Sequence, residues 1–307
     1  MNMVFIISAI VTIVGISTPI LLAATGELVV EKSGVLNLGI EGLMLVGAVT
    51  GFAVTFTSFS PWLGVLAAAA AGASASMVFA VLVLSLGSNQ VATGLALAIF
   101  GIGLSTLIGA GFVGIIVPPF TSIFPSVLAK DPFWRVLFGY SPLVYMALAI
   151  VAAVGWFLKY TRAGLVLRAV GENDLSAHSI GYSVIGIRYG AIAFGGALAG
   201  IAGCYFSMVI TPMWAEQMTA GRGWIALALV VFAGWKTRRL LVGAYFFGML
   251  MTLELYAKAT GFLYLPSQFW AAMPYVMAIV VLAIISFRDR SGSEAPACLG
   301  KPFVPNT

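Results

Sequence analysis

The chain has 307 residues, of which 61% are hydrophobic and 8% are charged, whereas about 25% of the residues in a soluble globular domain are charged. This composition excludes a soluble protein and predicts a single polytopic membrane domain. The formal net charge of +5 does not indicate a nucleic-acid partner, because the basic residues stand singly between apolar runs and form no aromatic-interleaved patch.

Apolar runs along the whole chain predict an all-α fold of about nine transmembrane helices. A helix needs about 20 residues to cross the roughly 30 Å hydrocarbon core of a bilayer. The predicted spans, in chain order, are 3–24, 36–57, 61–86, 89–112, 142–159, 184–210, 223–236, 240–258 and 269–287. The transmembrane domain therefore fills residues 1–290, and the segment 291–307, rich in Pro, Ser and Gly, predicts a disordered tail.

The distribution of basic residues predicts the orientation of these spans. Nine spans place the two termini on opposite sides of the bilayer, and cytoplasmic loops carry an excess of Lys and Arg. One predicted side holds Lys32, Lys159, Arg162, Arg168, Arg188, Lys236, Arg238, Arg239, Arg288, Arg290 and Lys301; the other holds Lys130, Arg135, Arg222 and Lys258. We therefore expect the N-terminus outside and the C-terminus in the cytoplasm.

Two polar residues stand at the start of the second predicted span, in "GVLNLGIEGLMLVGA". Asn37 and Glu41 are four residues apart, so on a helix they would share one face. A carboxylate at membrane depth is costly unless it faces protein or water, which makes Glu41 a candidate functional residue. Two interpretations stay open: Glu41 lines a polar pathway, or it is satisfied by helix contacts or lies at headgroup level.

A second polar group begins the fourth predicted span. Asn89, Gln90 and Thr93 follow a glycine at its cytoplasmic end, and uncharged amides and hydroxyls suit hydrogen bonding to a neutral polar solute. Ordinary hydrogen bonds between helices explain the same residues equally well. Small residues four apart, at Gly47 and Gly51, Gly186 and Gly190, and Gly196 and Gly200, predict close helix–helix packing.

Two connections carry further candidates. The cytoplasmic loop 160–183 contains the amphipathic stretch "LVLRAVGENDL", which is suited to dock in a groove of another protein; a solvated connector is the alternative. In the outer loop 211–222, Thr219 and Arg222 are predicted to lie at the outer mouth of the next span. There Arg222 would pair with Glu216, line an outer gate, or extend to lipid headgroups.

The residues that bind metal ions are scarce and scattered. Cys204 lies in an apolar run and Cys298 in the tail, so neither a disulfide nor a metal site is predicted from them, and His178 is the only histidine. No phosphate-binding loop with the Gly-x4-Gly-Lys-Ser/Thr spacing occurs. An enzyme that uses ATP on this chain is therefore not expected.

Three segments, "GVLNLGIEGLMLVGA", "RAGLVLRAVGENDLSAHSIG" and "TAGRGWIALALVVFAGW", resemble the signature segments of permease subunits of ATP-binding-cassette (ABC) importers. The class is that of branched-chain amino acids, ribose and nucleosides, and the resemblance is greatest to its nucleoside and simple-sugar branch. It covers residues 10–288 in the family's order and spacing. The sequence departs from the family at Asp174, where proline is common, and at His178, where a small or acidic residue is common.

The resemblance implies partners and a bacterial plasma-membrane location. Loop 160–183 would contain a coupling helix that contacts a separate ATPase subunit through Arg168, Ala169, Val170, Gly171, Glu172 and Asn173. A second permease subunit, a paralogue or an identical copy, would share the translocation pathway, an extracytoplasmic substrate-binding protein would deliver substrate, and lipid would surround the spans. ATP would be used by the partner alone, and this chain would bind no cofactor.

On this reading the polar side chains of the spans line a route for a hydroxyl-rich solute. Carboxylate and amide groups both bond to ribose or sugar hydroxyls, so Asn37, Glu41, Asn89, Gln90 and Thr93 are the expected pathway residues. The alternative is a proton- or ion-coupled secondary transporter that would use Glu41 and Glu254 as a proton relay. An intramembrane enzyme with Glu41 or His178 as acid or base is a third class, which lacks an obvious partner residue for catalysis.

Overall fold

The computed structural model describes residues 3–120, 124, 132–260, 266–288 and 295–303. All regular secondary structure in these residues is helical, apart from the isolated bridges Val113–Trp214 and Ile116–Met213. The prediction of an all-α polytopic fold is confirmed.

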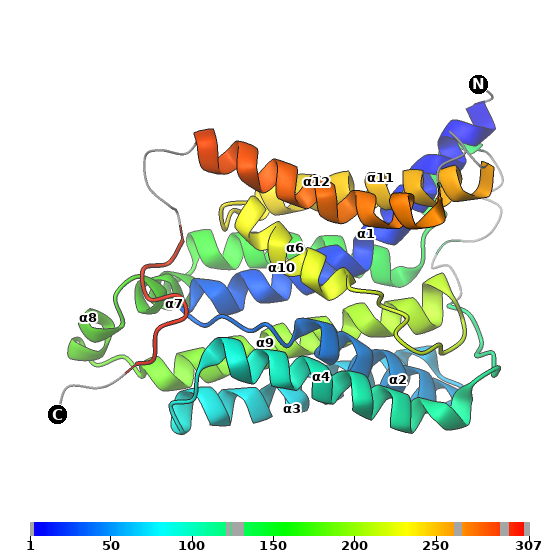
Figure 1. The fold of residues 1–307 in the computed structure, drawn as a ribbon. Helices are drawn as coiled ribbons and strands as arrows, with labels where there is room; N and C mark the ends of the chain where they lie inside the picture. Colours follow the sequence, from blue (N-terminus) through cyan, green and yellow to red (C-terminus); the bar gives the residue numbers. More distant parts are fainter. Residues whose placement is uncertain (1–2, 121–123, 125–131, 261–265, 289–294, 304–307) are drawn as a thin grey trace.

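The helices follow the chain in this order: α1 (Met3–Lys32), α2 (Ile40–Ser58), α3 (Pro61–Ala80), α4 (Gln90–Gly109), α5 (Pro132–Phe138), α6 (Pro142–Tyr160), α7 (Arg162–Glu172), α8 (Asp174–Ser179), α9 (Val184–Tyr205), α10 (Arg222–Phe232), α11 (Thr237–Thr260) and α12 (Ser267–Arg288). Helices α3 and α9 each continue into a π-helical turn, at Val81–Ser85 and Phe206–Ile210. A 3₁₀ turn, Ala110–Phe112, ends α4. Figure 1 shows a bundle in which the long helices run along one axis.

Seven helices of the described chain, not nine, are long and apolar enough to cross a membrane: α1, α2, α3, α4, α6, α9 and α11. The other two predicted spans correspond to shorter apolar stretches, Arg222–Phe232 and Gln268–Val281. At 1.5 Å per residue, the 11 residues of α10 rise only about 16 Å, roughly half of the hydrocarbon thickness. Helix α10 therefore cannot complete a crossing by itself.

Two non-helical segments, 33–39 and 211–221, run into the bundle before α2 and α10 begin. Helix α1 extends to Lys32, beyond the predicted end at 24, and α2 begins at Ile40, after the predicted start at 36. Figure 1 shows segment 33–39 turning back from the α7 end of the bundle and α2 beginning near its middle. The loop 211–221 does the same from the opposite end, and α10 then begins near the middle.

Close approach of small residues holds the centre of the bundle together. Helix α9 packs against α1, α2 and α3. Gly47 of α2 lies directly on Gly200 of α9, and Gly196 lies on Gly72 and Ser76 of α3, so that no Cβ would fit at these positions. Two of the predicted glycine pairs thus pack between helices. The third does not, because Gly190 has open space beside it.

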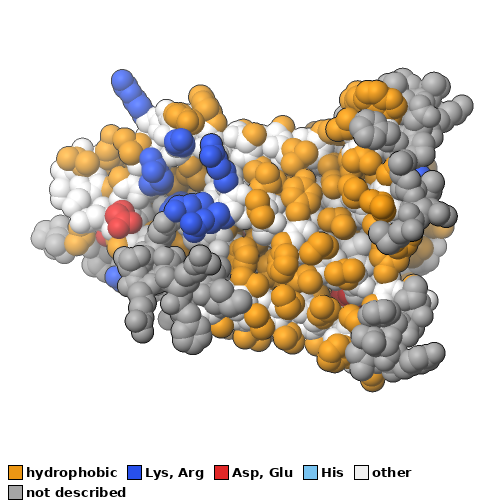
Figure 2. All heavy atoms as spheres, turned by 90° about the horizontal axis from the view of Figure 1, so that it is seen from above, with side chains coloured by type: hydrophobic (Ala, Val, Ile, Leu, Met, Phe, Trp, Pro, Cys, Tyr) orange, Lys and Arg blue, Asp and Glu red, His pale blue; other side chains and the backbone are white. Residues whose placement is uncertain are grey.

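The outside of the bundle is apolar along its middle. Large hydrophobic side chains are exposed on α3, α4, α11 and α12, including Leu66, Ile99, Val242 and Ile279. Figure 2 looks onto the side of the bundle where Figure 1 places α11 and α12; it shows a broad hydrophobic band there, with Lys and Arg side chains gathered at the end where Figure 1 places α7 and α8. This pattern fits a lipid-facing belt bounded by a polar end.

The predicted disordered tail is partly ordered. Residues 295–303 form a turn with hydrogen bonds from Leu299 N to Pro296 O at 3.0 Å and from Lys301 N to Cys298 O at 3.1 Å. This turn packs against the α7–α8 end of the bundle. The composition of 291–307 is typical of disorder, but it does not reveal that neighbouring elements supply hydrogen-bond partners for the turn. The rest of the predicted tail lies outside the described residues.

Candidate functional site

Glu41 lies where two helices begin, inside the bundle. The residue is 5% exposed. Its carboxylate accepts hydrogen bonds from Thr219 Oγ1 at 2.6 Å, Gly221 N at 2.8 Å and Gly223 N at 2.6 Å. Gly221 is the N-cap residue of α10, and Glu41 itself is in the first turn of α2. The carboxylate therefore faces the N-terminal ends of both helices.

The chemistry of helix ends explains why a carboxylate is kept there. The first N–H groups of a helix have no partner within the helix, and the helix dipole makes that end positive. At membrane depth water cannot supply the missing acceptors, so an anionic side chain must do so. Gly223 permits the close approach, since a Cβ there would lie 2.6 Å from Glu41 Oε2. Glu41 thus joins α2 to the start of α10.

Asn37 does not share a helix face with Glu41, because it lies in segment 33–39, before α2 begins. It is 2% exposed. Its backbone N–H donates to Glu27 Oε1 at 3.2 Å, and its side-chain oxygen accepts from Gly39 N at 2.9 Å. The prediction that Asn37 and Glu41 act from one turn of a helix is wrong. Asn37 instead fixes the backbone of the break between α1 and α2.

The residues at the start of α4 also bond locally. The Asn89 side chain caps α4 by accepting from Ala92 N at 3.0 Å, and the Thr93 hydroxyl bonds to Ser88 at 2.8 Å. Gln90 is buried; its Oε1 accepts from Leu36 N at 2.8 Å and its Nε2 donates to Lys301 O at 3.3 Å. The predicted pathway residues therefore do not bond to one another: Glu41 faces α10, Asn37 and Gln90 bond to the α1–α2 break, and Asn89 and Thr93 bond within the α4 start.

Thr219 and Arg222 lie where the returning loop 211–221 meets the start of α10, and their place at an outer mouth stays a prediction. Thr219 is fully buried beside Glu41. Arg222 donates to the carbonyls of Met218 at 3.2 Å and Thr219 at 3.4 Å, and its guanidinium lies 5.0 Å from the centre of the Phe206 ring. Among the described ion pairs none joins Arg222 to Glu216. Arg222 thus stabilises the loop that presents Thr219 to Glu41.

The amphipathic segment of loop 160–183 forms α7 and α8. Thr161 caps α7 by accepting from Gly164 N at 3.0 Å, and Asn173 caps α8 by accepting from Ser176 N at 2.9 Å. Leu165 and Leu175 are 59% and 45% exposed. These two short helices present an apolar and charged face at one end of the bundle, with no described residue covering those leucines.

Only part of the predicted ATPase contact faces outward. Arg168, Ala169, Glu172 and Asn173 are exposed, whereas Val170 and Gly171 are buried. Val170 packs with Ala177 and Val184, and Gly171 lies directly on the Lys32 carbonyl. An amphipathic helix must turn some of six consecutive residues inward. Val170 and Gly171 are therefore packing residues here.

Arg188 is a residue that the sequence analysis missed. It lies in α9, has no exposed surface, and donates from Nε to Ser33 O at 3.1 Å and from Nη2 to Asp174 Oδ2 at 3.1 Å. It therefore links α9 to α8 and to the α1–α2 break. Counting Arg188 only as a cytoplasmic charge concealed this role. The signal was an arginine five residues into an apolar run, with Asp174 standing where the family often has proline.

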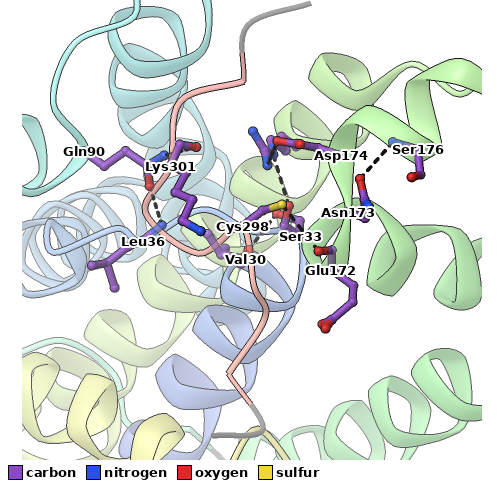
Figure 3. Close-up of polar contacts among 11 residues, drawn as sticks. Val30, Ser33, Leu36, Gln90, Glu172, Asn173, Asp174, Ser176, Cys298 and Lys301 are labelled. Carbon is purple, nitrogen blue, oxygen red and sulfur yellow. Dashed lines mark hydrogen bonds and ion pairs between the residues drawn. The ribbon is translucent and has the colours of Figure 1, made fainter.

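The tail turn bonds to α7, to the α1–α2 break and to the start of α4, and Figure 3 shows its Cys298 beside Glu172 and its Lys301 beside Gln90. Cys298 N donates to Gly171 O at 3.0 Å, and Gly300 N donates to Gly34 O at 3.2 Å. The Phe303 ring lies 5.5 Å from the His178 ring and packs against the small cluster around Val170. The α7–α8 segment is thereby tied to the break before α2.

Two further acids were missed because the predicted first span ended at residue 24. Glu27 and Glu31 lie in the last two turns of α1 and are 3% and 0% exposed. Glu31 Oε2 accepts from Trp235 Nε1 at 2.5 Å, and Glu27 accepts from Asn37 N. Both carboxylates bond to segments that follow a helix end, whereas Glu41 bonds to the start of α10.

The described residues contain no group of three or more His, Cys, Asp or Glu side chains placed to hold a metal ion, and both cysteines are free. The prediction that this chain binds no metal stays a prediction.

Comparison with known proteins gives a consistent picture. Residues 9–283 match the family described as the branched-chain amino acid transport system / permease component. The chain is 39% identical over 301 residues to an ABC transporter permease protein of Haloferax volcanii to which glucose is provisionally assigned, covering 90% of each chain. It is 31% identical to a guanosine ABC transporter permease protein of Bacillus subtilis (94% and 93% covered). It is 28% identical to a nucleoside ABC transporter permease protein of Lactococcus lactis (87% and 89% covered).

Proposed function

This chain belongs to the branched-chain amino acid transport system permease family, and on that premise we propose that it forms the translocation pathway of an ATP-driven importer of nucleosides or simple sugars. The chain is the permease component and is not itself the ATPase. It binds no cofactor of its own, and ATP is used by the partner subunit. Relatives that carry glucose, guanosine and nucleoside in their names support this choice of substrate class.

The observation that carries the proposal is the connection between α7–α8 and the α1–α2 break. Arg188 bonds to Asp174 and Ser33, Gly171 lies on Lys32, and the tail joins Gly171 to Gly34. The α7–α8 segment presents exposed Leu165, Leu175 and Glu172 for an ATPase groove. When the ATPase closes on nucleotide, it would move α7 and α8, and these direct contacts would pass the movement on to segment 33–39.

The middle of the pathway wall is formed by the two breaks. Glu41 ties the start of α2 to the start of α10, so a displacement of segment 33–39 moves both helix ends together. We assign Glu41 and Thr219 a positioning role in this unit, since their polar atoms are occupied by one another and by the backbone of α10. Substrate would pass beside these helix ends rather than bind to the Glu41 carboxylate itself.

The proposed topology has nine passes with the N-terminus outside and the C-terminus in the cytoplasm. Met213 bridges to Ile116 at one end of the bundle, whereas Lys236 lines a cavity with Lys32 and Arg168 at the other. Residues 211–236 therefore traverse the bundle, although α10 alone is too short. Segment 33–39 extends α2 in the same way. This supports nine passes made by the seven spanning-length helices, the 11-residue α10, and α12, in which the apolar stretch is Gln268–Val281.

The partners follow from the family and from this orientation. An ATPase subunit and a substrate-binding protein are implied for an ABC transporter permease of this kind. We propose that a second permease subunit, a paralogue or an identical copy, completes the pathway, and that the complex lies in a bacterial plasma membrane.

The two acids that a secondary transporter would use as a proton relay both have other partners. Glu254 forms an ion pair with Lys258 at 2.7 Å on the surface of α11, and Glu41 is engaged with α10. Among the described residues, no hydrogen bond or ion pair joins the two acids. Family membership also assigns energy coupling to a separate ATPase.

Uptake measurements test the proposal. Cells that express this chain with its partner subunits are compared with cells that lack only this chain, using radiolabelled adenosine, guanosine and glucose, with unlabelled ribose, galactose and leucine as competitors. We expect ATP-dependent uptake of nucleosides or glucose that leucine does not inhibit. Uptake that only leucine inhibits would overturn the substrate class, and uptake unaffected by loss of the chain would overturn the function.

A further inference from the structure

A basic cavity lies at the α7–α8 end of the bundle, apart from the Glu41 unit. It has a volume of about 960 Å³ and lies between the last turns of α6, the first turn of α11 and the ends of α1 and α10. Its cationic lining residues are Lys32, Lys159, Arg168, Lys236, Arg238 and Arg239. None of the described residues that line it is acidic. Glu31 contacts the lining residue Trp235 but does not line the cavity.

The first turn of α11 carries positive charge, although a helix N-terminus favours negative charge. Arg238 and Arg239 follow the first helical residue, Thr237, and no acidic residue occurs in that turn. A helix N-terminus favours negative charge and disfavours cations. An anion in the cavity would relieve the repulsion among the cations and complement the helix end, so the two features point to the same kind of ligand.

The general excess of cytoplasmic Lys and Arg does not explain this gathering. Arg162 belongs to the same end of the bundle but does not line the cavity, and Arg188 is buried in its ion pair with Asp174. The cavity instead collects cations from three separate stretches of the chain, at Lys32, within 159–168 and within 236–239. Like charges are brought together at a cost, which a bound anion would offset.

The cavity is placed at the edge of the lipid-facing belt. Figure 2 shows the cluster of Lys and Arg side chains directly beside the hydrophobic band. The lining residues Trp156 and Tyr160 are 61% and 68% exposed, and Lys159 lies 4.8 Å from the centre of the Tyr160 ring. Trp and Tyr at the end of a span are typical of the headgroup level of a bilayer.

We propose that this cavity binds the phosphate headgroup of an anionic phospholipid from the leaflet at the α7–α8 end. Apolar residues of the lining, such as Leu148 and Val151 of α6, lie toward the middle of the helix, where acyl chains would extend. Basic pockets between spans are suited to such headgroups. Because Lys32 ends α1 and Arg168 lies on α7, a bound lipid would brace the α1–α2 break and the α7–α8 segment.

The test measures lipid binding by the purified full-length chain in detergent, by native mass spectrometry and by thermal unfolding. The probes are phosphatidylglycerol, phosphatidylcholine and inorganic phosphate. The variants are Arg238→Gln with Arg239→Gln, the charge-conserving pair Arg238→Lys with Arg239→Lys, and the matched control Arg162→Gln, which removes an exposed cation of the same end outside the cavity.

We expect phosphatidylglycerol, but not phosphatidylcholine, to bind and to raise the unfolding temperature. The double Gln variant should weaken this binding by about 30-fold, because each basic residue near anionic lipid contributes about fivefold in affinity. The Lys pair and Arg162→Gln should bind within a few-fold of the parent chain. Equal binding of both lipids, or unchanged binding by the double Gln variant, would overturn the proposal. Inorganic phosphate that competes fully with phosphatidylglycerol would assign the cavity to free phosphate and overturn the lipid assignment.

Discussion

Glu41 shows how a polar residue in an apolar run is best explained by the backbone around it. A carboxylate can accept from several donors at once, and three converge on this one, from Thr219, Gly221 and Gly223. Two of these donors are backbone N–H groups, of Gly221 and Gly223, and among the described side chains only Glu41 accepts from them. The broken helices therefore account for the carboxylate without any contact to a solute.

Replacing Glu41 by Gln should lower stability and uptake together. The amide keeps one acceptor oxygen but turns an NH₂ group toward backbone donors, which leaves at least one N–H unsatisfied at a cost of about 1–3 kcal/mol. We expect a lower unfolding temperature of the purified chain and reduced uptake in cells at matched expression.

Thr219→Val is the matched variant for this prediction. It removes one donor and keeps the shape and the two backbone bonds, so a smaller loss, about 1 kcal/mol, is expected. If Glu41→Gln raised the KM of uptake without changing thermal stability, Glu41 would be a substrate ligand and its positioning role would be refuted.

For single residues, the sequence predicted that Glu41 has a function, but it did not predict which groups the carboxylate bonds to. The donors lie about 180 residues away in the chain, and a pattern within one run cannot reveal them. The pair of Arg188 and Asp174 could not be predicted for the same reason. Each is visible as a charged residue, but their pairing requires α8 and α9 to be folded side by side.

Among the elements, α7, α8 and the tail turn act as one unit. The small cluster of Val170, Ala177 and Val184 closes α7 and α8 onto the start of α9, and Phe303 packs against it. Backbone bonds from the turn to Gly171 and Gly34 then join this cluster to the α1–α2 break. An ATPase that pushes on α8 would thus push on a braced segment.

Removing residues 295–307 should loosen this unit without unfolding the bundle. The deletion eliminates the bonds to Gly171 and Gly34 and the Phe303 contact. We expect faster hydrogen–deuterium exchange of the α8 amides and reduced uptake while ATP hydrolysis by the complex persists. Phe303→Ala should reproduce part of the effect.

Lys301→Ala provides the control for the tail. Its exposed side chain is removed, but the carbonyl that accepts from Gln90 remains, so exchange and uptake should match the parent chain. If the deletion left α8 exchange unchanged, the tail would not brace the coupling segment.

Element lengths were predicted well where a helix spans the membrane alone, and poorly where a helix breaks. Periodicity and hydropathy do not distinguish a helix from an extended segment that is buried in protein, because both are apolar. The start of α2 at Ile40 and the 11-residue α10 are set instead by helix ends that meet at Glu41. Glu27 and Glu31 were hidden for a different reason, because hydropathy falls where the acids occur and the predicted first span ended at 24 although α1 continues to Lys32.

For the whole molecule, the number of passes and the number of spanning helices are separate quantities. Seven helices of the described chain are of spanning length, and we propose nine passes because 211–221 returns into the bundle before α10 begins. Seven and nine passes both place the termini on opposite sides. The two cases differ in where the residues after α10 lie.

Labelling of single cysteines with an impermeant maleimide separates these topologies. In a background with Cys204→Ala and Cys298→Ala, cysteines are introduced at the exposed positions Ser58, Ser179 and Lys236. We expect Ser58→Cys to react in intact cells, and Ser179→Cys and Lys236→Cys to react only after permeabilisation, since Lys236 lines a cavity with Lys32 and Arg168. Reaction of Lys236→Cys in intact cells, with Ser179→Cys protected, would mean that 211–236 does not cross the membrane. Reaction of Ser179→Cys in intact cells would reverse the orientation, and with it the side on which the ATPase binds.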